Sequence, residues 1–297
     1  MLPFPIISST NVLPDLDIKG TILLIGTTDM YYCAINSTVG DCYFGKESVA
    51  GFARYDSSTN TFVSLTSSPS NVTQYAYGSY GDYIYKSGGR STQTQRGADL
   101  HRYTISTDTW TILPNGSASS TNYQSVTAND TYAFKMLGNG STYRYNLSTN
   151  TYQALSTTPL MELGYDARAD YLCIRNIGDT MYCLSRKTLS SMQMTYDGTN
   201  PVFTKLADYP GYVGNESEYI CEMCVYKDNL YVLNNRSELF CYNVSTNSWR
   251  AYGVICPVTS KGFNDRNPVL FCASIKDSCL YCLIPTSTTS CNMYKIT

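Results

Sequence analysis

The sequence predicts an all-β fold: one six-bladed β-propeller domain spanning residues 1–297, with a four-stranded antiparallel sheet in each blade. Three observations predict it: a repeated tyrosine–aromatic pair, an aspartate that returns at nearly constant spacing, and the placement of strand signals at the two chain ends. Periods of roughly 40 to 50 residues are typical of architectures whose units bury their apolar faces against their neighbours.

The first observation is a Tyr followed seven residues later by a large aromatic residue. The pairs are Tyr55 with Phe62, Tyr103 with Trp110, Tyr145 with Tyr152, Tyr196 with Phe203, and Tyr242 with Trp249. Polar, turn-prone residues lie between the two aromatics, as in Asn-Val-Ser-Thr-Asn-Ser before Trp249. A strand ending at the Tyr and another starting at the aromatic predict a β-hairpin. We interpret the pairs as packing residues between strands and between blades.

The second observation is an Asp just before a Tyr-containing apolar segment. It occurs at Asp29, Asp82, Asp130, Asp179, Asp228 and Asp277, at intervals of 53, 48, 49, 49 and 49 residues. Asp between two apolar runs favours a hairpin because its carboxylate can accept hydrogen bonds from nearby backbone N–H groups. The predicted blades are 20–67, 72–115, 121–158, 165–209, 217–256, and 267–297 together with 1–10.

The third observation concerns the ends of the chain. The sequence stops three residues after Tyr294, which leaves no room for a fourth strand in the last unit. The segment from Phe4 to Ile7 has the aromatic-x-x-aliphatic pattern expected of that strand. We therefore expect the N-terminal segment to complete the last blade, with Phe4 meeting Tyr294, and to close the ring without an unpaired edge.

This combination resembles the kelch-repeat β-propeller family over essentially the whole chain. The family pattern places two glycines after the second strand, then a Tyr, then a Trp about seven positions later. The chain keeps the Tyr and the aromatic in five copies but the double glycine only at Gly88-Gly89, so it resembles a divergent member. The resemblance implies that partners dock on the face formed by the loops after the second strand and the loops that join the blades.

Composition narrows the classes of partner and compartment. Net charge is -2, charged residues make up 15%, tyrosines number 28, and no basic run occurs, which argues against nucleic-acid binding. No apolar run is long enough for a membrane helix, and the N-terminus lacks the features of a signal peptide. Twelve cysteines, nine Asn-x-Ser/Thr sequons and the low charge favour an extracellular or luminal setting, where a glycoprotein is expected, over the cytoplasm.

Residues for catalysis or metal binding are scarce in the sequence. The copper oxidases with kelch-like propellers need two histidine ligands, and this chain has only His101, for which we expect a structural role. The pairs Cys221/Cys224 and Cys279/Cys282 lie within predicted strands, where residues three apart point to opposite faces. No phosphate loop, nucleophile elbow or calcium loop is present. The sequence therefore predicts no enzyme, no cofactor and no metal site.

The cysteines could also form disulfides. In an oxidising compartment the candidate pairs are Cys33 with Cys42, Cys173 with Cys183, and Cys272 with Cys282. In the cytosol we expect none.

Two functions remain open. The first is a non-enzymatic module for protein–protein interaction or structural assembly, part of a larger complex; the second is a carbohydrate-binding propeller. The first is favoured. The residues predicted to contact a partner, chosen because Tyr and Arg are enriched at interface hot spots, are Arg90, Arg96, Tyr123, Tyr165, Arg186, Tyr212, Arg236 and Arg266.

Overall fold

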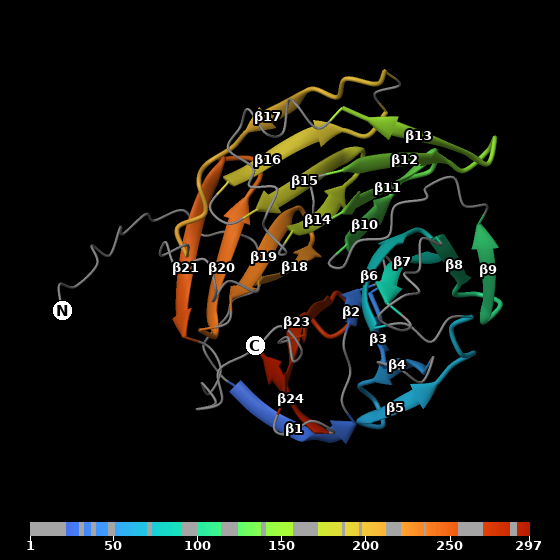
Figure 1. Ribbon diagram of the computed structural model, residues 1–297. Helices are drawn as coiled ribbons and strands as arrows, with labels where there is room; N and C mark the ends of the chain where they lie inside the picture. Colours follow the sequence, from blue (N-terminus) through green and yellow to red (C-terminus); the bar gives the residue numbers. More distant parts are fainter. Residues whose placement is uncertain are drawn as a thin grey trace.

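The chain forms six four-stranded antiparallel sheets that stand around a common axis as the blades of a propeller (Figure 1). The computed structural model describes residues 22–29, 33–36, 40–46, 51–69, 73–90, 100–113, 124–137, 141–156, 172–185, 188–195, 198–211, 221–234, 236–254, 270–285 and 290–297. The regular secondary structure in these ranges consists of β-strands alone. None of the described residues forms a helix that could span a membrane. The predicted fold class is confirmed.

The strands follow one another in chain order from the innermost to the outermost position of each blade. Blade 1 contains β2 (Cys33–Asn36), β3 (Cys42–Gly45), β4 (Phe52–Asp56) and β5 (Thr61–Ser64). Blade 2 contains β6 (Thr73–Tyr80), β7 (Tyr83–Arg90), β8 (Leu100–Thr104) and β9 (Thr109–Leu113). Blade 3 contains β10 (Gln124–Ala128), β11 (Tyr132–Leu137), β12 (Thr142–Asn146) and β13 (Thr151–Leu155).

The remaining blades repeat this order, except that the last takes one strand from the start of the chain. Blade 4 contains β14 (Leu172–Ile177), β15 (Thr180–Ser185), β16 (Thr188–Gln193) and β17 (Phe203–Lys205). Blade 5 contains β18 (Cys221–Tyr226), β19 (Asn229–Asn234), β20 (Glu238–Asn243) and β21 (Ser248–Val254). Blade 6 contains β22 (Leu270–Ser274), β23 (Cys279–Pro285), β24 (Ser290–Ile296) and β1 (Ile22–Asp29).

Burial within a blade falls from the inner strands to the outer one. Every residue of β19 is buried, whereas β21 alternates between exposed and half-buried positions. The second strands are covered on both faces by neighbouring blades and contain apolar runs such as Leu-Tyr-Val-Leu in β19. The outermost strands face water along one edge and carry Thr and Ser.

The core lies between the blades. The buried apolar residues form six clusters, one at each of the six interfaces between neighbouring blades. The first strands contact one another in the order β2, β6, β10, β14, β18, β22 and back to β2. At one such contact, a Cβ on Gly78 of β6 would overlap the Val126 carbonyl on β10, so only glycine permits this approach. The ring is therefore closed by continuous packing.

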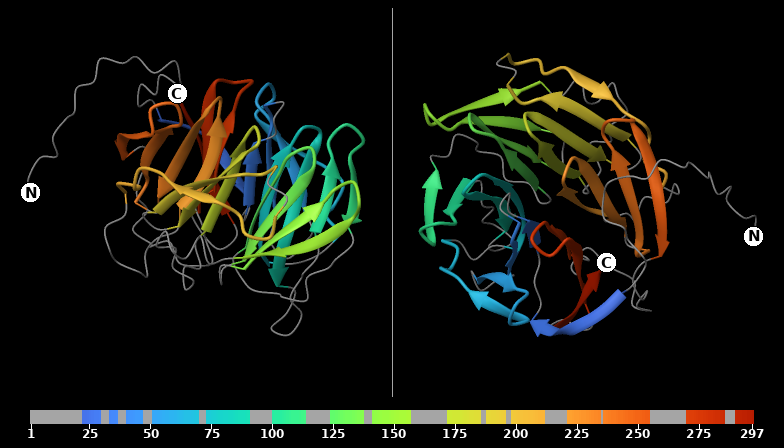
Figure 2. Two further views of the ribbon diagram at one scale, coloured as in Figure 1. Left: turned by 90° about the horizontal axis from the view of Figure 1, so that it is seen from above. Right: turned by 180° about the vertical axis from the view of Figure 1, so that it is seen from behind.

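The prediction that the start of the chain completes the last blade is confirmed, but the predicted strand is wrong. The outer partner of β24 is β1, with Ile22 opposite Ile296 and Asp29 opposite Ser290. Tyr294 lies opposite Leu24, not Phe4. The segment from Phe4 to Ile7 lies outside the described residues. Figure 1 shows β1 and β24, the two ends of the colour scale, side by side, and Figure 2 shows the same sheet from two other directions.

The same error displaced the prediction for blade 1. Asp29 is the last residue of β1, not the turn of a hairpin, so Ile22–Asp29 belongs to blade 6 and not to the predicted blade 20–67. The first hairpin of blade 1 joins β2 to β3 and reaches β3 through Gly40 and Asp41. Asp41 thus holds the position that Asp82 holds in blade 2. Asp41 lies 41 residues before Asp82, fewer than the 48 or 49 between the later repeats, which is why the near-constant spacing pointed to the wrong Asp.

Candidate functional site

The repeated tyrosine–aromatic pair forms a cross-strand contact between the third and fourth strands. Tyr242 lies opposite Trp249 with ring centroids 5.1 Å apart. The corresponding distances are 5.3 Å for Tyr55 and Phe62, 5.2 Å for Tyr103 and Trp110, and 4.8 Å for Tyr145 and Tyr152. Tilted aromatic pairs at these distances add stability beyond the area they bury.

The turn between the two aromatics is held by the Tyr hydroxyl. Tyr242 Oη donates to Asn247 Oδ1 at 2.7 Å, and Tyr145 makes the same bond to Asn150 at 2.6 Å. Tyr103 donates to Asp108 at 2.7 Å, and Tyr55 donates to Asn60. These Asn and Asp residues have φ between 48° and 56°, a left-handed conformation that short polar side chains adopt more readily than others. Burial raises the pKa of Tyr242 to about 12, so its hydroxyl stays a donor.

The same turn also binds the preceding blade. Asn247 Oδ1 accepts a hydrogen bond from Ala207 N at 2.9 Å, while Trp249 Nε1 donates to Ala207 O at 2.9 Å. In blade 2, Asp108 Oδ1 accepts from Thr66 N and Trp110 Nε1 donates to Thr66 O, both at 2.9 Å. In each case the backbone N–H and C=O of a single residue, Ala207 or Thr66, are both hydrogen bonded, and this residue follows the fourth strand of the preceding blade. We call this arrangement the blade clamp.

Blade 4 departs from the predicted pairing. Phe203 lies opposite Met192 on β16, and Tyr196 falls outside the described residues. The contact to the preceding blade is still made, because Thr199 O accepts a hydrogen bond from Ser156 N at 2.7 Å. A backbone carbonyl here replaces the side-chain oxygen of Asn247, and the turn between β16 and β17 is longer than the others.

Removing the acceptor of the blade clamp should weaken the protein without changing its surface charge. We expect Asn247→Gly to lower the free energy of unfolding by about 1–2 kcal/mol, because two hydrogen bonds are lost while the left-handed backbone stays allowed. Asn247→Asp keeps an acceptor oxygen, as in blade 2, and should change stability by less than about 0.5 kcal/mol. Urea denaturation followed by circular dichroism measures both. Equal losses in the two variants would contradict the clamp.

The predicted partner-binding residues fall mostly outside the described part of the chain. Arg96, Tyr123, Tyr165, Arg186, Tyr212 and Arg266 lie there. Arg90 is the last residue of β7, and Arg236 is exposed two residues after β19 ends. Both residues lie where the second strand of a blade ends. Because every blade has the same antiparallel strand order, the second strands of all blades run in the same direction relative to the axis of the ring. The strand end at Arg90 and the position of Arg236 therefore lie on the same face of the ring, here called the loop face.

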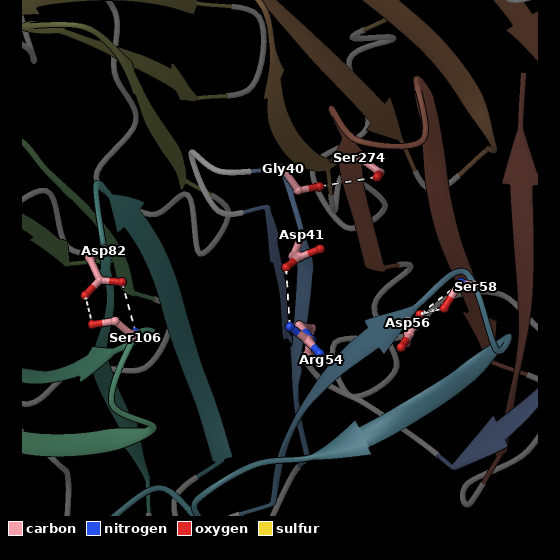
Figure 3. Close-up of polar contacts among 8 residues, drawn as sticks. All are labelled: Gly40, Asp41, Arg54, Asp56, Ser58, Asp82, Ser106 and Ser274. Atoms are coloured by element: carbon pink, nitrogen blue, oxygen red, sulfur yellow. Dashed lines mark hydrogen bonds and ion pairs between the residues drawn. The ribbon is translucent and has the colours of Figure 1, made fainter.

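On the opposite face, here called the turn face, the polar side chains bond to one another. Asp82 accepts hydrogen bonds from the backbone N at 2.9 Å and from the hydroxyl of Ser106 (Figure 3). Asp277 of blade 6 accepts from Ser57 of blade 1 at 2.7 Å. Asp179 of blade 4 accepts from Asn129 of blade 3 at 2.8 Å.

The side chain of Asn129, which is part of an Asn-x-Ser/Thr sequon, takes part in this hydrogen-bond network. This side chain is only 1% exposed and its Nδ2, the atom that would carry a glycan, donates to Asp179. A glycan cannot attach there in the folded protein. The counting of sequons alone therefore overstates the number that the fold leaves accessible.

Most cysteines are buried free thiols, and the predicted disulfides are not formed. Cys173 lies opposite Leu184 and Cys183 opposite Ile174, so these two thiols point to opposite faces of blade 4. Cys272 and Cys282 are offset in the same way in blade 6. Cys42 is also free and lies opposite Asn36, three rungs from Cys33. Residues on opposite faces, or three rungs apart, lie beyond the span of a disulfide.

A charge pair near the axis, of the buried Arg175 and the partly buried Glu222, was missed by sequence reasoning. Arg175 on β14 lies 3.8 Å (Nη2 to Oε2) from Glu222 on β18, and Arg175 Nη1 donates to Ile174 O at 2.8 Å. Burial raises the pKa of Glu222 to about 7, although Arg175 partly offsets this. A single charged residue in each of two otherwise uncharged first strands was the available signal.

His101 is buried on β8, opposite Lys86, which is buried as well and donates to Ser68 Oγ at 2.7 Å. Among the described residues, no three His, Cys, Asp or Glu side chains are grouped as metal ligands. Cys183 is fully buried, which raises its pKa to about 12, so its thiol is protonated near neutral pH.

Comparison with known proteins gives the fold. Neither a known family profile nor a curated protein sequence matches the chain. The solved structure of YjhT, a propeller, superposes with a TM-score of 0.64 and 12% sequence identity, covering 89% of this chain and 94% of that one. Similarity at this identity establishes the architecture only, and the kelch resemblance stays a prediction. The chain is thus a six-bladed β-propeller that shares its fold with YjhT.

Proposed function

We propose that this propeller is a non-enzymatic module for protein–protein interaction or structural assembly, and that its partner docks on the loop face. The observation that carries the proposal is the common placement of Arg90 and Arg236 at the ends of β7 and β19, in blades 2 and 5. Arginine contributes strongly at protein interfaces because its guanidinium makes several directed hydrogen bonds. Two such residues on one face of a closed ring support a docking surface spread over several blades.

The turn face is a weaker candidate. Its aspartates Asp82, Asp179 and Asp277 accept hydrogen bonds from their own blade or from the neighbouring blade. A partner on that face would have to compete for acceptors that already hold the blades together. Arg236, by contrast, is exposed, and its backbone N donates to Asn234 Oδ1 at 3.0 Å, which holds the loop that carries it.

The positions of the side chains that could take part in catalysis support a binding role for the protein. His101 is buried inside blade 2, Cys183 is protonated and enclosed at the interface of blades 3 and 4, and Glu222 is paired with Arg175. Each of these groups is engaged in the packing or electrostatics of the ring. Their positions support a structural role for them, and leave the loops to carry function.

The test compares charge reversals on the two faces. The tagged full-length chain is purified from the cells that express it, and its co-purifying proteins are quantified by mass spectrometry. We expect Arg236→Glu, and more strongly Arg90→Glu/Arg236→Glu, to reduce a stoichiometric partner at least about tenfold, the loss typical of a hot-spot residue. Lys276→Glu, on an exposed turn-face residue, is the matched control and should keep the partner.

Two results would contradict the proposal. One is a partner lost with Lys276→Glu and kept with the double arginine variant. The other is saturable binding to a glycan array, without any stoichiometric protein partner, which would assign the propeller to carbohydrate recognition.

A further inference from the structure

Blade 6, which contains strands from both ends of the chain, packs against blade 1. This interface is bridged by close contacts between the first strand of blade 6 and the start of β3. Ser274 Oγ donates to Gly40 O at 3.3 Å (Figure 3), and Cys42 Sγ donates to Ala273 O at 3.4 Å. Gly40 has φ +101°, and a Cβ there would stand 3.0 Å from Lys276 N. The two backbones therefore approach closely along this stretch.

Two thiols point into one buried cluster at this approach. Cys42 on β3 and Cys272 on β22 both belong to it, and Cys42 Sγ reaches the carbonyl of Ala273, the residue next to Cys272. They are 2% and 0% exposed. Cys42 is separated by 231 residues from Ala273, the neighbour of Cys272, so the contact joins the two ends of the ring.

We propose that Cys42 and Cys272 form a disulfide that closes the propeller covalently when the chain folds in the presence of a disulfide oxidant. One Sγ, as the thiolate, attacks the oxidant's S–S bond and forms a mixed disulfide, releasing one thiol. The second Sγ, after losing its proton, displaces the other half of the oxidant. One S–S bond forms in the protein, one S–S bond of the oxidant breaks, and the oxidant leaves as two thiols.

The structure also determines when the reaction can occur. In the closed ring neither thiol is accessible to an oxidant, and burial raises the pKa of Cys272. Thiolate formation and access both require the interface of blades 6 and 1 to open. The cross-link therefore forms during folding or on transient opening of the ring, and reduction of the folded, oxidised protein is slow for the same reason.

This pair is distinct from the pairs that sequence spacing suggested. Those pairs lie within one blade and point to opposite faces, whereas Cys42 and Cys272 come from different blades and point into one cluster. A cross-link here restrains a long loop of the unfolded chain, the case in which disulfides are expected to stabilise most.

The test is oxidative refolding of the full chain. The protein is unfolded, refolded with a mixture of reduced and oxidised glutathione, alkylated, and digested without reduction for peptide mapping. We expect the peptides containing Cys42 and Cys272 to be linked in the major product. Its melting temperature should exceed that of the reduced protein by about 5–10 °C.

Cysteine variants show which thiols cause the difference in melting temperature. Cys42→Ala and Cys272→Ala should each abolish the difference in melting temperature between oxidised and reduced protein. Cys183→Ala, which removes another fully buried thiol far from this interface, should retain it. A map in which Cys42 and Cys272 stay alkylated, or are linked to other cysteines, overturns the proposal, and the wild-type map decides this even if a variant does not fold.

Discussion

Replacing Trp249 by alanine should lower the free energy of unfolding by about 3–5 kcal/mol, the range measured for truncation of large core aromatics. The indole packs against Tyr209 at 5.0 Å and Tyr242 at 5.1 Å between ring centroids, at the interface of blades 4 and 5. It also supplies the Nε1 donor to Ala207 O. Urea denaturation followed by far-ultraviolet circular dichroism measures the loss, since the substitution removes a fluorescent residue.

Trp249→Phe separates the two contributions of this side chain. It keeps most of the aromatic contact and removes the Nε1 donor, so we expect a loss of about 1–2 kcal/mol. Because the residue belongs to the blade clamp and not to the loop face, partner binding by the folded fraction should be unchanged in both variants. An unchanged melting temperature together with abolished binding would show that Trp249 is a recognition residue.

The second large effect is a dependence of stability on pH that arises from Glu222. Its pKa in the folded protein is raised to about 7 from the ordinary value of 4.5, because burial disfavours the carboxylate more than Arg175 favours it. Between these two values the unfolded chain releases the proton and the folded protein keeps it. The free energy of unfolding therefore falls as pH rises from about 4.5 to about 7, and is lowest above that range.

Glu222→Gln should remove this dependence. We expect it to raise the free energy of unfolding by about 2–3 kcal/mol at pH 8 and to change it little at pH 4, following the conversion of a pKa shift to free energy. The control is Asp208→Asn, in a solvent-exposed ion pair with Lys205 at 3.0 Å, which should matter by less than about 1 kcal/mol. Stability curves of wild type and Glu222→Gln that stay parallel from pH 4 to pH 8 would refute this assignment.

The repeat was readable from the sequence because it reflects local chemistry. A Tyr, a left-handed Asn or Asp, and an aromatic at fixed spacing specify one hairpin, and that hairpin recurs in each regular blade. The closure of the last blade by the first strand was predictable from the missing strand after Tyr294. Which segment supplies that strand was not, because both the segment from Phe4 to Ile7 and Ile22–Asp29 have suitable apolar patterns.

Details that depend on register could not be predicted. Cys173 and Cys183 miss being directly opposite by one residue, and a shift of one residue in a strand moves a side chain to the other face. Contacts between different blades are even harder to predict from the sequence than the register within one blade. The ion pair of Arg175 with Glu222 and the cluster shared by Cys42 and Cys272 bring together residues of different blades, and no local pattern specifies such contacts.

The central claim is that one set of residues holds the ring together and another, on the loop face, binds a partner. The most direct measurement compares Asn247→Gly with Arg90→Glu/Arg236→Glu for both melting temperature and partner recovery by affinity purification. The account predicts that Asn247→Gly melts at a lower temperature and keeps its partner, while the arginine variant melts like wild type and loses it. A stable Asn247→Gly protein without a partner, or an arginine variant that keeps its partner in full, would contradict the account.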